Sequence, residues 1–172
     1  MKKGQRQVTI ALMRNEVEYD AQSILSVIAD TLPGEETAHV KHIYNDICEG
    51  ENARRTIRFA DTAFAVLAEH LHGYTATPIG GDITTDDIAH TPIVYSLAMQ
   101  MDDDTSSSQV ALVKTLAHDY MVLAIVCGWL ALIGSDRLDY YYSMRDTALA
   151  GAVKAADSHN RIGRVTPFFG NT

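Results

Sequence analysis

The sequence predicts an all-α protein, a bundle of about five helices with an irregular loop near residues 73–92 and extended termini. Apolar residues recur in several segments at the three- and four-residue spacing of amphipathic helices. Proline is scarce, with four residues among 172. The 47% hydrophobic and 21% charged fractions are ordinary for a globular chain. We expect a single domain over residues 1–172, with a core of about 8–158 and tails at 1–7 and 159–172.

Three helices are expected in the first half of the chain. The first spans about 8–32, where Pro33-Gly34 stops it. The second covers about 35–50, with acidic residues at its start and Gly50 at its C-terminal end. The third runs over about 51–71 and buries an apolar stripe.

The middle of the chain is harder to assign from its pattern. Residues 73–92 contain Pro78 and several glycines, threonines and aspartates, which are typical of a loop. The apolar segment 93–101 suits either a short helix or a strand. The acidic and serine-rich turn after it leads into another helix, with one of the serines at 106–108 as the N-cap.

The segment 109–132 is predicted to be the central helix, because its second half is apolar on nearly all sides. A break at 134–136 then indicates that the last helix, about 136–158, packs antiparallel to it. The longest apolar run, 120–133, is shorter than the ~20 residues that cross a bilayer. We therefore expect a buried helix and no membrane partner.

Charge is unevenly distributed along the chain. The formal net charge is −8, but five of the 14 basic residues lie in segments 1–6 and 161–172, which contain no acid. The rest of the chain therefore holds nine basic residues against all 22 acidic ones, a balance of −13. An acidic body is a poor surface for phosphate, so we expect no sequence-specific nucleic-acid binding. Basic ends suit contact with an acidic neighbour or with another copy of the chain.

The cysteines and the N-terminus point to the cytoplasm. Cys48 and Cys127 have neither metal-ligand spacing nor the spacing of a redox pair. The basic start is followed by a mixed, charged segment rather than by the apolar core of a signal peptide. We expect synthesis in the cytoplasm with reduced thiols.

The adjacent pair His118-Asp119 is the first candidate for chemistry. Metal-dependent phosphohydrolases use such a pair on one metal, together with an upstream His and a downstream Asp. Adjacent His and Asp are also common by chance, so we favour a structural role and keep the hydrolase as an alternative. The other ligands would come from His70, His72 or His90 and from Asp136 or Asp139.

Two further patterns are weaker. Glu36, His39 and His42 share a helix face, but a di-metal bundle also needs two further carboxylates on other helices, so we favour a solvated helix face. Gly80-Gly81-Asp82 lacks the Lys-Ser/Thr of a phosphate loop and is typical of a turn. We therefore expect no enzyme activity, no cofactor and no metal.

Aromatic residues near the C-terminus are the best candidates for partner binding. Three consecutive tyrosines, 140–142, cannot all be buried on one helix, so Tyr140 and Tyr142 are candidates for an interface. The tail adds two phenylalanines to a polar, basic segment, where exposure is costly. They could fold back on the bundle or dock into a neighbouring subunit. The tail candidates are Arg161, Arg164, Pro167, Phe168 and Phe169.

Segments over most of the chain carry a family resemblance. They are 21–30, 42–52, 55–59, 87–92, 118–122, 128–130, Asn160-Arg161 and Pro167-Phe168. In order and spacing they are similar to small helical proteins of tailed-phage and prophage structural modules. The resemblance implies a head–tail connector or neck subunit, which assembles in a ring between the portal and the tail.

The leading expectation is therefore a non-enzymatic virion-assembly protein that self-associates and docks to portal or tail components. Its location would be the cytoplasm when synthesised and the virion afterwards. Two alternatives stay open: a metal-dependent phosphohydrolase that uses His118 and Asp119, and a bacterial helical adaptor or regulatory protein.

Overall fold

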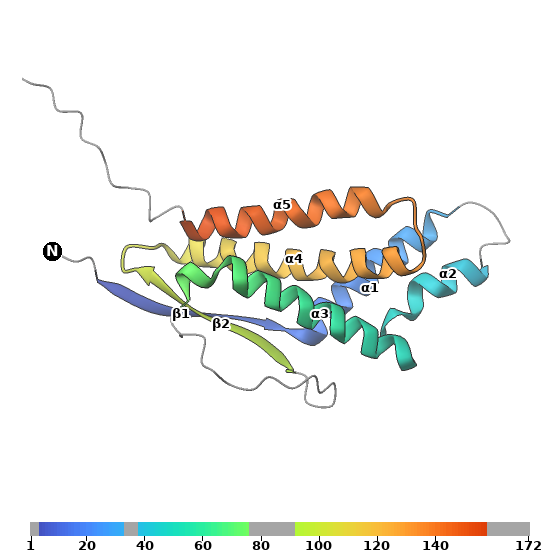
Figure 1. The fold of residues 1–172 in the computed structure, drawn as a ribbon, viewed down its shortest axis with the longest axis horizontal. Coiled ribbons are helices and arrows are strands. Elements are labelled where there is room, and N and C mark those ends of the chain that lie inside the picture. The colour runs from blue at the N-terminus through green and yellow to red at the C-terminus, as the bar shows by residue number, and fades with distance from the viewer. Residues whose placement is uncertain (1–3, 33–37, 76–91, 158–172) are drawn as a thin grey trace, which may run out of the picture.

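The computed structural model describes residues 4–32, 38–75 and 92–157 (Figure 1). Within these ranges the chain is mostly helical, with five α-helices, and it also forms a two-stranded antiparallel sheet. The expected helical bundle is therefore confirmed, but the expectation of a purely α fold is wrong. In chain order the elements are β1 (Gln5–Met13), α1 (Arg14–Asp30), α2 (Ala38–Asn45), η2 (Asp46–Cys48), α3 (Gly50–His70), η3 (His72–Tyr74), β2 (Val94–Asp102), α4 (Ser107–Leu132) and α5 (Leu138–Asp157).

The first helix begins later than the sequence predicted, because its expected start is the strand β1. Val8, Ile10 and Leu12 alternate with more polar or smaller residues, and Ile10 and Leu12 are buried. Ile10 and Met13 also fit a helical spacing with Val17, which is why a helix was predicted from residue 8. The pairing partner, which decides between the two, lies about 90 residues away and cannot be seen in a local pattern.

The ambiguous apolar segment 93–101 forms most of that partner strand, β2. Its register with β1 runs from Gln5 opposite Asp102 to Met13 opposite Val94. Tyr95, Met99 and Met101 on β2 are buried in the same core as the helices. Figure 1 shows the two strands as a long ribbon beneath the helices.

The structure corrects the predicted N-terminal tail and the start of the predicted loop. Residues 5–7 belong to β1 rather than to an extended tail, and Arg6 donates a hydrogen bond to the Thr105 carbonyl at 2.6 Å. The start of the expected loop near 73–92 lies in η3, followed by a single bridge from Thr75 to Met99. Residues 76–91 and 158–172 lie outside the described ranges.

The helix α4 is the centre of the fold, as predicted. Ser106 caps its N-terminus by accepting a hydrogen bond from the Gln109 amide at 3.2 Å. Its buried residues occur on nearly all sides, and α1, α3 and α5 all pack against it. The antiparallel partner α5 lies alongside it after a turn in which Gly134 has a φ of 66° (Figure 1).

Within the described ranges, α4 is also the only helix that could cross a membrane by length and composition, with a mean hydropathy of 1.7 in its most apolar window. Half of that window is buried inside the protein. Length and composition therefore do not decide where the protein resides.

The packing of α3 on α4 depends on Gly128. A Cβ at this position would lie 2.9 Å from the Phe59 ring, which is closer than a carbon contact allows. We expect Gly128→Val to lower the free energy of unfolding by about 1–3 kcal/mol through overpacking. Urea denaturation followed by circular dichroism measures the change.

The matched control is Ala131→Val, because Ala131 lies on the same helix with its side chain exposed. It introduces the same β-branched residue without the Phe59 contact. Helix propensity alone favours valine over glycine and disfavours valine relative to alanine, so a Gly128→Val variant as stable as wild type would contradict the close-packing account.

Candidate functional site: an apolar groove between α1 and α5

Two adjoining hollows form a groove on the surface, with α1 and α5 as its walls and α4 as its floor. The larger has a volume of about 400 Å³ and the smaller about 270 Å³. They share Ile24, Leu123 and Met144, so they form one continuous depression. The remaining lining residues of this α1/α5 groove are Ser23, Val27, Leu116, Asp119, Val122, Tyr140, Tyr141, Ser143, Thr147 and Ala148.

Large apolar side chains of the α1/α5 groove are exposed to solvent. Val27 is 63% exposed, Tyr140 is 64% exposed and Met144 is 40% exposed. These three line the smaller hollow from both walls. Met144 lies at helical spacing with the buried Ala148, a pattern that predicts burial, but it is exposed because no helix in the described ranges covers α5 on this side of α4. The groove is thus an apolar surface that nothing in the described part of the chain covers.

The predicted tyrosines have different surroundings. Tyr140 lies in the groove and meets the Tyr141 ring edge-on, with the ring centroids 5.2 Å apart. Tyr142 does not line the groove. Its ring contacts the Arg145 guanidinium at 4.7 Å, and Arg145 also binds Asp146. Of the two predicted interface tyrosines, Tyr140 is therefore the one that belongs to this site.

His118 links two of the helices that form the groove. Its Nε2 lies 2.9 Å from Asp20 Oδ2, and this contact joins α4 to α1. The neighbouring Asp119 lines the larger hollow and places a carboxylate at its edge. The two residues of the suggested metal pair therefore have different surroundings: His118 makes a helix–helix contact, and Asp119 lines the groove.

The other ligands of the suggested metal sites are not brought to this pair. His70 Nδ1 lies 2.9 Å from the carbonyl of Val66 on its own helix, and His42 pairs with Asp46 at 2.6 Å. Over the residues that the structure describes, no three His, Cys, Asp or Glu side chains are placed to hold a metal. His90 and the side chain of His39 lie outside that description.

The predicted contact residues of the tail also lie outside the described residues. These are Arg161, Arg164, Pro167, Phe168 and Phe169.

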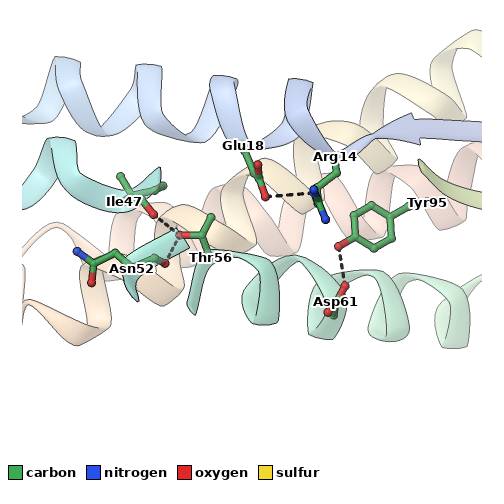
Figure 2. Close-up of polar contacts among 7 residues, drawn as sticks. All are labelled: Arg14, Glu18, Ile47, Asn52, Thr56, Asp61 and Tyr95. Carbon is green, nitrogen blue, oxygen red and sulfur yellow. Dashed lines mark hydrogen bonds and ion pairs between the residues drawn. The ribbon is translucent and has the colours of Figure 1, made fainter. Parts of the chain in front are cut away.

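A polar cluster between α1 and α3 was not anticipated from the sequence (Figure 2). Arg14 Nε lies 3.6 Å from Glu18 Oε1 on α1, and the Tyr95 hydroxyl donates to Asp61 Oδ1 at 2.6 Å. On α3, the Thr56 hydroxyl is 2.6 Å from the Ile47 carbonyl. The long-range Tyr95–Asp61 bond joins β2 to α3 and has no local sequence signal.

Burial governs the ionisation of this cluster and of the thiols. Burial and the hydrogen bond to Asp61 raise the pKa of Tyr95, so its phenol stays protonated at neutral pH. Burial raises the pKa of Cys127 to about 11, and burial with nearby Glu18 and Glu49 raises the pKa of Cys48. Both thiols are therefore protonated at neutral pH, where a thiolate is the reactive form.

Most of the groove residues, Ile24 and Val27 among them, were not predicted from the sequence. The available signal is a second apolar stripe on α4, where Leu112 and Leu116 lie beside the buried Val113 and Ala117. Such a stripe does not reveal whether another helix covers it.

No protein-family model, no curated protein and no solved structure matches this chain.

The polar cluster gives a pH-dependent prediction at Glu18. Burial raises the pKa of Glu18 above its usual value, although the Arg14 guanidinium opposes part of that rise. The folded state therefore binds a proton more readily than the unfolded chain, and ionised Glu18 costs stability at neutral pH. We expect Glu18→Gln to raise the melting temperature at pH 7.

This gain should shrink as the pH falls through the raised pKa toward the ordinary value of 4.5. Below that pH, Glu18 is neutral in both states of the wild-type protein. Melting temperatures from pH 7 to pH 4 measure the trend. A variant less stable than wild type at pH 7 would mean that the pair with Arg14 outweighs the cost of burial.

Proposed function

We propose that this protein is a non-enzymatic assembly protein, which self-associates and docks to other structural proteins through the α1/α5 groove. The single observation behind the proposal is the groove itself, an apolar depression bounded by three helices. Concave apolar surfaces with exposed aromatic residues are typical of binding sites. Tyrosine and methionine are also enriched at protein interfaces, and both occur here as Tyr140 and Met144.

Energetics support a macromolecular partner for this groove. Fully burying a side chain such as Val or Met stabilises a complex by about 1.5–3 kcal/mol. Val27, Tyr140 and Met144 are already 63%, 64% and 40% exposed, so a partner that covers all three removes much apolar surface from water. Their arrangement on two facing helix walls gives such a partner a groove to enter rather than a flat surface.

The composition of the groove supports a binding role over catalysis. Among its lining residues, the only carboxylate is Asp119, and the rest are apolar side chains, hydroxyls and two tyrosine rings. General acid–base chemistry uses positioned titratable groups with a pKa near the working pH. One carboxylate at the edge of an apolar groove is better suited to a basic group on a partner.

More specifically, we propose that the protein is a connector or neck subunit of a tailed phage or prophage. Its support is the sequence resemblance over segments such as 42–52 and 118–122, together with the acidic body and basic ends. Portal or tail components are the partners in this proposal, in addition to further copies of the chain. The protein would be made in the cytoplasm, would need no cofactor and would become part of the virion.

The test of the proposal is self-association of groove variants. Val27→Lys and Met144→Lys place a charge in the groove at exposed positions, where the folded monomer tolerates it. We expect the double variant to weaken self-association by at least about tenfold, the equivalent of 1.4 kcal/mol. Sedimentation velocity over a concentration series measures this constant.

The matched control is Ile93→Lys with Val94→Lys, because Ile93 is 67% and Val94 37% exposed and neither lines the groove. It adds the same two charges at apolar positions of similar exposure and should leave self-association unchanged. Wild-type protein that stays monomeric across the series would overturn the proposal. Equal loss in the control would show that net charge, not the groove, controls association.

A further inference from the structure

The α1/α5 groove has features that specify its ligand. Its floor and walls are apolar, so the ligand must offer large apolar side chains as anchors. An acidic residue lies at its edge, since Asp119 lines the larger hollow, and the 52% exposed Asp20 contacts the adjacent His118. A segment that combines aromatic anchors with nearby cations matches both features.

The C-terminal segment of the same chain has this chemistry. Residues 158–172 contain Arg161 and Arg164, no acid, and the adjacent pair Phe168 and Phe169. Each phenylalanine can bury ~150–250 Å². Proline restricts its own φ and disfavours a helical conformation of the residue before it, so Pro167 in the sequence lowers the entropy lost on binding.

The length of this segment fits the groove. Phe169 follows Arg161 by eight positions, so an extended segment covers up to roughly 26 Å. Along α5 the groove residues run from Tyr140 to Ala148, which corresponds to roughly 12 Å of helix. A bound segment is therefore long enough to lie along the whole groove, with the arginines nearer one end and the phenylalanines nearer the other.

We propose that the α1/α5 groove of one subunit binds residues 161–169 of a second copy. This inference rests on the proposed function, because a tail that filled its own groove would leave no groove for self-association. Phe168 and Phe169 provide the apolar anchors. Arg161 and Arg164 face the acidic edge that contains Asp119. Groove and tail are different surfaces, so copies either link head-to-tail or exchange tails reciprocally in a two-fold dimer.

Two full-length variants test this contact by complementation. The tail variant, Phe168→Ser with Phe169→Ser, keeps an intact groove. The groove variant, Val27→Lys with Met144→Lys, keeps an intact tail. We expect wild-type protein to self-associate and each variant alone to be monomeric. Mixed in equal amounts, the two variants should form a 1:1 heterodimer that grows no further, because only one productive contact remains.

Sedimentation velocity of the separate and mixed proteins gives the outcome, and raising the salt from 50 to 500 mM should weaken the heterodimer because the arginine contacts are screened. If the tail variant associates as strongly as wild type, the inference is wrong while the proposed function stands. If wild type is monomeric and the tail variant newly associates, the tail covers its own groove. If wild type and both variants are monomeric, the proposed function itself fails.

Discussion

The requirement to cover α4 on every side determines the rest of this structure. Its residues from Tyr120 to Leu130 are almost all buried, so no face of this part of the helix can be left to water. The helices α1, α3 and α5 and the strand β1 supply that cover, and Gly128 lets α3 approach closely through Phe59. The cover is incomplete between α1 and α5, and this is where the apolar groove lies. The candidate site is thus a consequence of how the core helix is enclosed.

Polar contacts fix the positions of the covering elements rather than drive the fold. Trp129 on α4 donates to the Ile43 carbonyl at 3.1 Å, His118 pairs with Asp20 on α1, and Tyr95 on β2 bonds Asp61 on α3. Each joins elements that are distant in the sequence. Bonds of this kind contribute only ~0.5–3 kcal/mol net, but they select one arrangement of apolar surfaces among several. The His118–Asp20 contact holds one wall of the groove, α1, against its floor, α4.

Sequence alone predicted the elements whose signal is local. The central helix, its Ser106 cap, the antiparallel last helix and the third helix all follow from apolar periodicity, capping and glycine positions. The strand β1 could not be predicted this way, because Ile10 and Met13 fit a helical spacing and the pairing with Val94–Asp102 is long-range. For the site, Tyr140 was identified because three adjacent tyrosines cannot share one buried face. Its companions Val27 and Met144 were not, since exposure depends on which neighbouring helix is missing.

A crosslink from the groove wall tests the central claim, that the α1/α5 groove is a contact surface between proteins. A photoreactive phenylalanine analogue at Tyr140, which is 64% exposed, replaces one aromatic ring by another and leaves the core intact. The account predicts that illumination yields a covalent dimer from this position and none from the same analogue at Ile93, which is 67% exposed but does not line the groove. No dimer from position 140, or equal dimer from both positions, would contradict it.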